Sequence, residues 1–328
     1  MSNRLDVVAI GNAIVDVLAQ VDDAFLGAND VEKGIMTLID QDRAKELYGA
    51  MPAATEISGG SAANTAAAAA AIGAKTGFLG KVRDDQLGNI FAHDIRALGV
   101  EYPGPITPSS SDAETSRCLV MVSPDGERSM NTFLGASVGL VADDIDTDLM
   151  GRADWLYLEG YLFDTPEAKE AYARAISATK AGGGKASITL SDPFCVDRHR
   201  DDFRKLIREE MDLVFANKAE VMSLYQTDDL ATAFKQLASE CELAAVTLSA
   251  DGAAVVRGDE VTTVPARATQ IVDTTGAGDL FAAGFLAGLA QGADDARAAS
   301  MGCAAAGEII SHLGARPEAD LKALMASL

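Results

Sequence analysis

The order of apolar and polar positions along the chain indicates an α/β protein. Residues 6–11 form a short apolar run typical of a buried strand, and from residue 154 onward strand patterns alternate with helical patterns such as residues 166–181. The strand patterns of this second half lie at residues 155–158, 186–190, 213–216 and 244–248. Because each pairs naturally with the next as a βαβ unit, the alternation predicts a parallel sheet covered by helices.

Consecutive helical patterns close the chain, with no strand pattern between them. Their small residues allow close helix packing, and they lie at residues 276–290, 294–311 and 318–328. An alanine-rich helix is also predicted at residues 62–72, far shorter than the ~20 residues that a membrane span requires. We therefore expect no membrane partner.

Two segments, residues 12–38 and 99–133, interrupt this alternation. In the second, residues 117–122 alternate, a turn follows at Pro124-Asp125-Gly126-Glu127, and residues 128–133 return, which predicts a β-hairpin. Two strand-like insertions can pair into a small sheet that projects as a lid over a site. We expect such a lid on one domain, residues 1–328, whose body comprises residues 1–11, 39–98 and 134–328.

Composition and charge exclude other classes of protein. With 48% apolar and 23% charged residues, the 328-residue chain has ample material for a buried core. Asp and Glu number 49 against 27 Lys and Arg, so there is no broad basic face for nucleic acid. The first residues carry no export signal, and the four cysteines are scattered without a metal-binding spacing. We expect a cytoplasmic protein.

The segment Ile271-Val-Asp-Thr-Thr-Gly-Ala-Gly-Asp279 gives the most informative chemical signal. It leads from a short apolar strand into a helix that begins near Gly276, so the amides of Ala277, Gly278 and Asp279 are expected to be unpaired at a positive helix end, which binds anions. A carboxylate beside a bound anion repels it unless it serves chemistry, and a general base for a hydroxyl is the obvious role of Asp279. The alternative is a glycine-rich turn in which Asp279 only stabilises the helix.

One N-terminal motif offers groups that suit a polyol, and a second places a carboxylate after an apolar strand. In Ser58-Gly-Gly-Ser-Ala-Ala-Asn-Thr65, Gly60 lets the backbone approach a ligand, and the amide of Asn64 can both donate to and accept from a polyol. In Gly11-Asn-Ala-Ile-Val-Asp16 a carboxylate follows an apolar strand. Structural roles stay open for both motifs, with a serine capping the alanine helix and Asp16 in a polar turn.

Together these motifs resemble the ribokinase-like (PfkB) carbohydrate and nucleoside kinases. Residues 273–279, DTTGAGD, closely match the C-terminal signature of that family, and residues 58–65 with residues 80–88, GKVRDDQLG, match its N-terminal signature. The resemblance covers essentially the whole chain and implies an α/β fold, a ribokinase-like three-layer α/β/α core with a small β-rich lid. It also implies that Asp279 is the catalytic base and that the backbone of Gly276, Ala277 and Gly278 forms the anion hole.

The resemblance implies roles for further residues and for the cofactors. The substrate-binding residues that it implies are Asn12, Asp16, Gly60 and Asn64. Kinases of this family use ATP with Mg²⁺, and Asn217-Lys-Ala-Glu220 matches their NxxE motif, in which Glu220 holds Mg²⁺ through water. Unaided by the resemblance, the same four residues are interpreted as a helix N-cap followed by a first-turn acid.

Two other motifs resemble the nucleotide and cation sites of the family. Thr247, Ser249 and Gly252 resemble the TxGxxG nucleotide-binding loop, with Ser249 where the first glycine is usual, and the alternative is a simple hairpin turn at Asp251-Gly252. Asp273, Thr275 and a carbonyl near Gly314 resemble the monovalent-cation site, which implies stimulation by K⁺.

The acceptor substrate is a nucleoside or a sugar. Gly11-Asn-Ala-Ile-Val-Asp16 resembles the GNPLLD of adenosine kinases, and residues 188–194 resemble their NLSAPF segment, so we favour phosphorylation of the 5′-hydroxyl of adenosine. Residues 80–88 and Thr274-Thr275 also fit a sugar kinase acting on ribose, fructose or 2-keto-3-deoxygluconate. A non-catalytic binding protein of this fold is the third alternative. The aromatic candidates for a purine slot are Phe133, Tyr161, Phe163 and Phe194, and the sequence leaves monomer and homodimer open.

Overall fold

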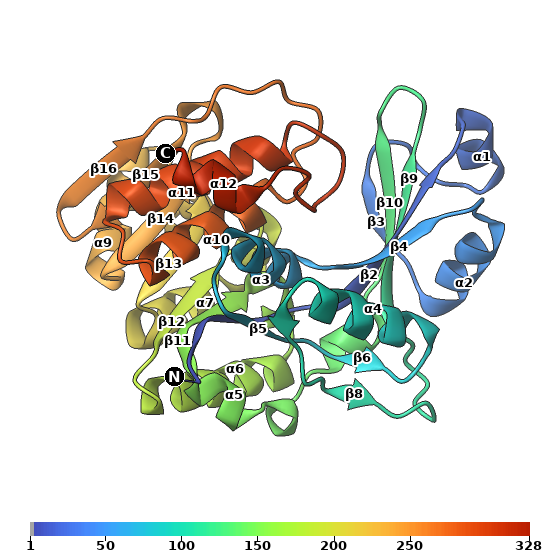
Figure 1. Ribbon diagram of the computed structural model, residues 1–328, viewed down its shortest axis with the longest axis horizontal. Coiled ribbons are helices and arrows are strands. Elements are labelled where there is room, and N and C mark those ends of the chain that lie inside the picture. Colours follow the sequence, from blue (N-terminus) through green and yellow to red (C-terminus); the bar gives the residue numbers. More distant parts are fainter. Residues whose placement is uncertain (1–2) are drawn as a thin grey trace.

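The computed structural model describes residues 3–328 and contains a large central sheet (Figure 1). Its strands are β1 (Leu5–Ile10), β5 (Thr76–Leu79), β7 (Val100–Glu101), β11 (Ala153–Glu159), β12 (Lys185–Thr189), β13 (Leu213–Asn217), β14 (Leu243–Thr247), β15 (Ala253–Arg257) and β16 (Glu260–Val264). The spatial order is β16-β15-β14-β13-β12-β11-β1-β5-β7. Neighbouring strands are parallel except for the pairs β14–β15 and β15–β16, which are antiparallel. The parallel strands predicted in the second half of the chain are therefore present, and a hairpin extends them.

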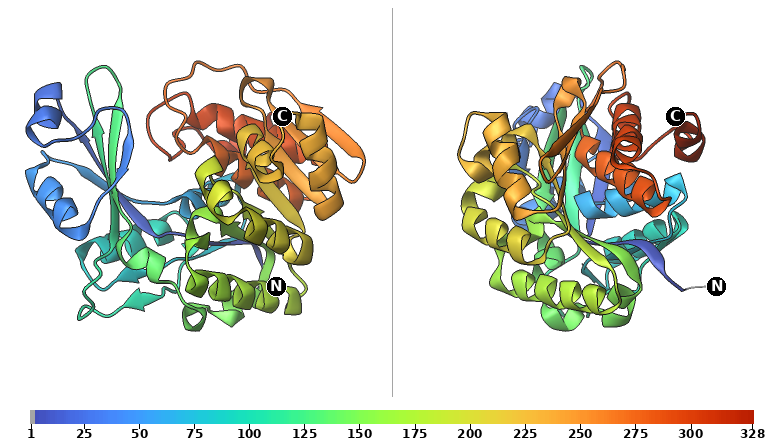
Figure 2. Two further views of the ribbon diagram at one scale, coloured as in Figure 1. Left: turned by 180° about the vertical axis from the view of Figure 1, so that it is seen from behind. Right: turned by 90° about the vertical axis from the view of Figure 1, so that its left-hand side faces the viewer.

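Helices cover both faces of this sheet (Figure 2). One face packs against α3 (Ser61–Ile72), α10 (Ala277–Ala290) and α11 (Asp295–Ile309), with α12 (Leu321–Ala326) behind them. The other face packs against α5 (Thr147–Gly151), α6 (Pro166–Ala181), α7 (Pro193–Glu210), α8 (Lys218–Tyr225) and α9 (Leu230–Glu240). No helix within residues 3–328 is long and apolar enough to cross a membrane. The result is the three-layer, ribokinase-like α/β/α fold.

The sequence of β1 explains why the central strands are continuously apolar. Val7 and Ala9 point into the core shared with α3 and α10, whereas Val8 and Ile10 point into the core on the opposite side. All four side chains are completely buried. Alternate residues of a strand face opposite sides, so a strand covered on both sides needs apolar residues at every position.

A second, smaller sheet projects from this body (Figure 1). It has the order β3-β10-β9-β2-β4, with the bounds β2 (Ile14–Gln20), β3 (Met36–Leu38), β4 (Thr55–Gly59), β9 (Ser116–Val122) and β10 (Arg128–Phe133). The predicted hairpin is present as β9 and β10, which pair antiparallel, and β2 pairs with β9 in parallel. The helices α1 (Asp23–Ala28) and α2 (Gln41–Ala50) accompany this sheet, and α4 (Gln86–Ala97) contacts both sheets.

The boundaries of the smaller sheet differ from those expected. We assigned residues 39–98 to the body, but β4 pairs with β2 and α2 packs on β9 and β10. Conversely β7, within residues 99–133, pairs with β5 of the main sheet, and β8 (Ile106–Thr107) pairs with β6 (Val82–Arg83). Strands this short carry too few residues for their alternation to indicate which sheet they join.

The smaller sheet has one covered face and one that faces the body. Val15, Val17 and Leu119 are buried on the covered face. The other face carries two cross-strand rows, Asp16–Cys118–Thr132–Leu38 and Leu18–Val120–Met130–Met36. Apart from Asp16 and Thr132, these side chains are apolar, and at the edge Met36 and Leu38 are 54% and 60% exposed. We call this surface the open face.

Candidate active site

Two helix N-termini meet at Asp279. Asp279 lies in the first turn of α10, and its carboxylate accepts hydrogen bonds from Ser61 Oγ at 2.6 Å and Asn64 Nδ2 at 3.1 Å, both in the first turn of α3. Burial raises the pKa of Asp279, while these two hydrogen bonds and the charge of Arg316 oppose the rise. Ser61 and Asp279 are 218 residues apart in the chain, so two motifs that are distant in the sequence form one site.

Two of the three amides that we expected to be unpaired at the start of α10 are unpaired in the described part of the chain. Within residues 3–328, the amides of Gly278 and Asp279 form no hydrogen bond. The amide of Ala277, which we expected to be unpaired as well, donates to the carbonyl of Thr274 at 3.2 Å. Gly276 is the reason, because its φ of 77° closes a tight turn that directs the next amide back into the chain.

Gly276 and Gly278 offer a matched test of this turn. A Cβ at Gly276 would lie 3.2 Å from the Cβ of Ala315 on a left-handed backbone, whereas a Cβ at Gly278 would meet nothing within 4 Å. We expect Gly276→Ala to lower the free energy of unfolding by ~1–2 kcal/mol. Gly278→Ala should leave stability unchanged or slightly higher. Chemical denaturation of both variants measures the difference, and equal stability losses would contradict this account of the turn.

Asp16 lies on the open face, opposite Asp279. Its carboxylate accepts no hydrogen bond within residues 3–328, although burial raises its pKa to about 6. The charges of Arg316 and Arg128 oppose that rise, and the charge of Asp279 adds to it. A desolvated carboxylate without a donor is costly unless a ligand supplies one, so Asp16 is suited to accept hydrogen bonds from hydroxyl groups.

Asn12 is placed differently from the other expected substrate residues. Its Nδ2 donates to Glu159 Oε1 at 2.7 Å, and its Oδ1 accepts from Ser137 Oγ at 2.8 Å, so both ends of the amide have protein partners. Glu159 also accepts from the amide of Ala62 at 2.9 Å, and burial raises its pKa to about 7. Asn12 and Glu159 thus join the turn before β2 to the start of α3, where Gly60 is the N-cap.

Two arginines that the sequence analysis did not single out lie in this site. Arg316 Nη2 donates to Ser58 Oγ at 2.9 Å and to the Ser58 carbonyl, while its Nε and Nη1 are buried without a partner among residues 3–328. Arg128 forms an ion pair with Asp273. Neither arginine belongs to a recognisable motif, so only the fold reveals that they flank Asp16.

The NxxE segment forms a helix cap at the carboxyl end of β13. Asn217 Oδ1 accepts from the amide of Glu220 at 2.9 Å, and Glu220 Oε2 accepts from the amide of Asn217 at 2.9 Å, which is a reciprocal capping box. Glu220 is 4% exposed, and burial raises its pKa to about 7. Each carboxylate oxygen keeps a second lone pair, so a water-bridged Mg²⁺ remains compatible with the cap.

The nucleotide-loop motif follows the neighbouring strand. Thr247 ends β14 and pairs with Asn217 across the sheet. Ser249 has a φ of 55° and Gly252 a φ of 92°, so both adopt backbone conformations that favour glycine. Ser249 therefore takes a left-handed conformation at the position of the first glycine of the TxGxxG motif, and the chain then turns into β15 as a hairpin.

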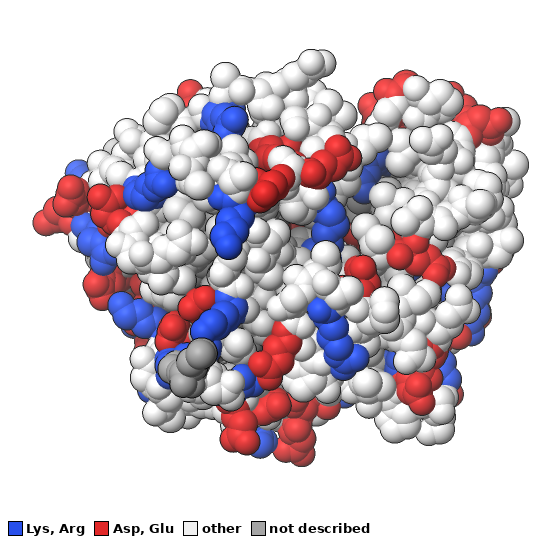
Figure 3. All heavy atoms as spheres, in the orientation of Figure 1, with Lys and Arg blue, Asp and Glu red and all other residues white. Residues whose placement is uncertain are grey.

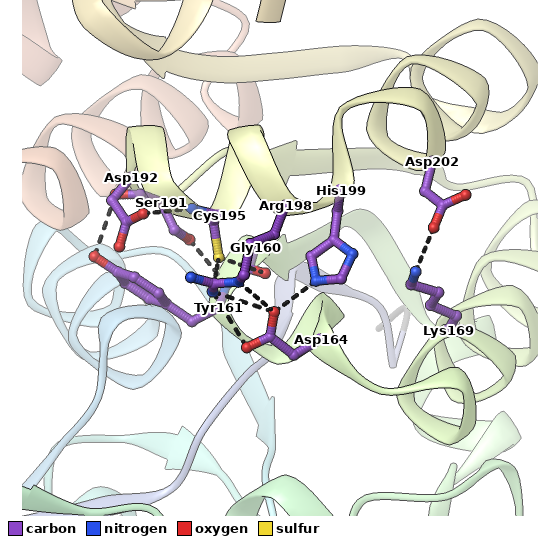
Figure 4. A network of polar contacts seen from close by, with 10 residues as sticks. All are labelled: Gly160, Tyr161, Asp164, Lys169, Ser191, Asp192, Cys195, Arg198, His199 and Asp202. Atoms are coloured by element: carbon purple, nitrogen blue, oxygen red, sulfur yellow. Dashed lines mark hydrogen bonds and ion pairs between the residues drawn. The ribbon is translucent and has the colours of Figure 1, made fainter. Parts of the chain in front are cut away.

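Polar contacts fix the loops after β11 and β12 (Figure 4). The amide of Tyr161 donates to Ser191 Oγ at 3.1 Å, and the Tyr161 hydroxyl donates to the Ser191 carbonyl at 3.2 Å. Asp164 accepts from Arg198 Nη2 at 3.2 Å and contacts His199 Nε2 at 2.6 Å. These contacts join the segment after β11 to the segment after β12.

The aromatic candidates divide between the core and the surface. Phe163 is 4% exposed and stacks on Phe203 with ring centroids 4.8 Å apart, so it belongs to the core. Tyr161 and Phe194 are 42% and 75% exposed. Phe133 lines a cavity of about 540 Å³ with Leu38, Leu134 and Val138, beside the open face.

The space between body and smaller sheet is hollowed in the space-filling view (Figure 3). Acidic and basic atoms lie along its body side, and uncharged atoms cover much of the smaller sheet. Asp279 lies at the start of α10, where its own amide and that of Gly278 are unpaired within residues 3–328, and its charge acts on Asp16 of the smaller sheet. A carboxylate next to a helix end that can bind an anion, beside a hollow between two parts of the chain, is an arrangement suited to phosphoryl transfer.

Comparison with known proteins agrees with this class. The model of the pfkB family carbohydrate kinases matches residues 29–321, and the chain belongs to this family. It is therefore a kinase with an alcohol group as acceptor, and kinases of this family use ATP and Mg²⁺.

Solved structures and curated relatives with different names resemble this chain. An adenosine kinase from Sinorhizobium meliloti is 47% identical, covers 99% of each chain and superposes with a TM-score of 0.89. A probable sugar kinase from Rhizobium etli CFN 42 is also 47% identical, covers 100% of this chain and 99% of its own, and has a TM-score of 0.89. A fructokinase from Klebsiella pneumoniae is 28% identical over 71% of this chain and 76% of its own length. Because proteins named as nucleoside kinases and proteins named as sugar kinases both resemble this chain, the comparisons do not decide the acceptor.

Proposed function

We propose that this kinase transfers the γ-phosphoryl group of ATP to the 5′-hydroxyl of adenosine. The observation that supports this acceptor best is the open face, where a single carboxylate, Asp16, stands among apolar side chains. A nucleoside matches both features, because its ribose offers a vicinal diol to the carboxylate and its purine offers a flat apolar surface. Among the solved relatives, the adenosine kinase from Sinorhizobium meliloti at 47% identity agrees with this choice.

A sugar acceptor fits the open face less well. Ribose or fructose presents hydroxyls in most directions and would leave Leu18, Met130 and Met36 in contact with polar groups. Burying a hydroxyl without a hydrogen-bond partner costs ~1–3 kcal/mol. Cys118 and Val120 are buried, but Leu18, Met130, Met36 and Leu38 are partly or largely exposed. These exposed side chains favour a ligand with an apolar part, because burying such surface contributes ~25 cal/mol per Å².

The proposed chemistry assigns separate tasks to the residues around Asp279. Asp279 accepts the proton of the 5′-hydroxyl, while Ser61 and Asn64 hold its carboxylate in place. The amides of Gly278 and Asp279 donate to the phosphoryl oxygens as negative charge spreads over them. When bound, Mg²⁺ neutralises phosphate charge, and Glu220 is the residue that would hold its waters.

We further propose that the smaller sheet acts as a lid. Asp16 on the sheet and Asp279 on the body would both contact a nucleoside between them, so a bound substrate would hold the two parts together. Closure would exclude water from the transferring phosphoryl group and reduce ATP hydrolysis in the absence of an acceptor.

A substrate panel tests the proposed acceptor. ADP formation from Mg·ATP is measured with adenosine, other nucleosides, ribose, fructose and 2-keto-3-deoxygluconate. We expect kcat/KM to be highest for adenosine, by roughly 10²-fold or more over any free sugar, because the sugars lack the purine that the open face would bury. A free sugar as the best acceptor would instead favour a sugar kinase, and binding without turnover of any compound would favour a non-catalytic protein.

A further inference from the structure

A guanidinium group of the smaller sheet reaches the segment that precedes the anion-binding amides. Arg128 Nη1 forms an ion pair with Asp273 Oδ2, and the two side chains are 10% and 9% exposed. Arg128 belongs to β10, whereas Asp273 lies six residues before Asp279 on the body. The pair therefore joins the smaller sheet to the loop that leads into α10.

Four protein donors already surround the carboxylate of Asp273. Its Oδ1 accepts from the amide of Thr275 at 3.0 Å and from Thr275 Oγ1 at 2.7 Å. Its Oδ2 accepts from the amide of Gly314 at 3.1 Å and from Arg128. Although burial acts to raise it, the pKa of Asp273 is lowered by the hydrogen bonds from Thr275 and Gly314 and by the charge of Arg128.

This donor set does not fit a monovalent cation. A cation at Asp273 needs carboxylate lone pairs that are free to coordinate it, but three of the four already accept hydrogen bonds from Thr275 and Gly314. The remaining position is taken by the positive charge of Arg128, which is fixed to the protein. The lone pairs and the negative charge of the Asp273 carboxylate, which a bound K⁺ would satisfy, are thus already satisfied by protein groups.

We propose that Arg128 takes the place of the monovalent cation at Asp273, which makes this kinase independent of K⁺. The ion pair orders the loop from Asp273 to Gly278, and the inference rests on the proposed function in so far as that loop supplies the phosphoryl-binding amides. Because Arg128 comes from the smaller sheet, the loop is ordered by the position of that sheet rather than by an ion from solution.

Thermal unfolding in two salts tests this proposal without any substrate. The midpoints of wild type, Arg128→Met and Arg117→Met are compared in KCl and in tetramethylammonium chloride at equal ionic strength. Arg117 is a matched control, because it also lies in the smaller sheet and pairs with Glu114, on the opposite face from Arg128. We expect equal midpoints in both salts for wild type and Arg117→Met, and a midpoint of Arg128→Met that is a few degrees higher in KCl.

Steady-state rates with the best acceptor of the panel give a second measurement. Wild type should be equally active in both salts, whereas Arg128→Met should lose roughly tenfold to a hundredfold in tetramethylammonium chloride and recover partly in KCl. Arg128→Lys keeps the charge and should stay insensitive to K⁺. Stimulation of wild type by K⁺, or an Arg128→Met variant that K⁺ neither stabilises nor activates, would overturn the proposal. Failure of adenosine as acceptor leaves the thermal result unaffected, so the two proposals fail separately.

Discussion

Replacing Asp279 with asparagine is expected to lower kcat by roughly 10²–10⁴-fold, the usual contribution of a general base. The variant can no longer accept the proton of the acceptor hydroxyl, but it keeps nearly the same shape. Because the amides that hold the phosphoryl group stay in place, the KM values of both substrates should change little. Initial-rate kinetics measure the two effects separately.

The surroundings of Asp279 suggest that this variant will fold. Ser61 Oγ can accept as well as donate, and Asn64 Oδ1 is buried with no partner among residues 3–328, so a rotated Asn64 amide can accept from the new NH₂ group. Asp42→Asn is a suitable control, because Asp42 is a first-turn carboxylate of α2, away from the site. We expect wild-type kcat from the control. Near-normal turnover of Asp279→Asn at an unchanged thermal midpoint would refute the assignment of the base.

Replacing Asp16 with alanine is expected to weaken adenosine binding strongly. A carboxylate that accepts from two neighbouring hydroxyls makes two charge-assisted hydrogen bonds, each worth ~1.5–3 kcal/mol. Loss of one such bond corresponds to a roughly 10- to 150-fold weaker affinity. Part of the loss should appear in kcat, because a misplaced ribose also misplaces the 5′-hydroxyl.

A comparison of adenosine with 2′-deoxyadenosine isolates the diol. Wild type should prefer adenosine, and Asp16→Ala should largely erase that preference. Since the pKa of Asp16 is raised to about 6, the measurement belongs well above that pH, where the carboxylate is ionised and able to accept. Leu18→Ala, two positions along the same open face, should weaken both nucleosides equally and serves as the control. An undiminished preference in Asp16→Ala would show that Asp16 does not bind the diol.

Elements with a long, regular pattern were predictable from the sequence. The strands β11 to β14 and the closing helices α10 and α11 follow the predicted order, since each shows enough periodic positions to separate a strand from a helix. The hairpin of β9 and β10 was predictable from its alternation and its turn. Residues 39–98 were assigned to the body although β4 joins the smaller sheet, because residues 55–59 contain no feature that specifies β2 as the partner.

The candidate site was only partly accessible from the sequence. Asp279, Gly278 and Asn64 belong to motifs, but the contacts that join them across the fold depend on how α3 and α10 pack. Arg128 and Arg316 are single residues without a motif, so nothing in the sequence indicates that their charges converge on Asp16. In the sequence, Glu159 looks like an ordinary polar residue at the end of an apolar strand. Only its hydrogen bonds in the fold show that it joins Asn12 to α3.

The parallel pairing of β2 with β9 has a consequence for how the protein folds. Asp16 lies opposite Cys118, so about a hundred residues of chain separate the two partners. The entropy of closing such a loop must be lost before the strand contacts compensate for it, and pairings of this kind form slowly. During synthesis, the strand that carries Asp16 leaves the ribosome long before its partner does. The smaller sheet therefore cannot form before residues 116–122 are available, and the amides around Asp16 should become protected from hydrogen exchange later than those of β11 to β14, whose partners are close in the chain.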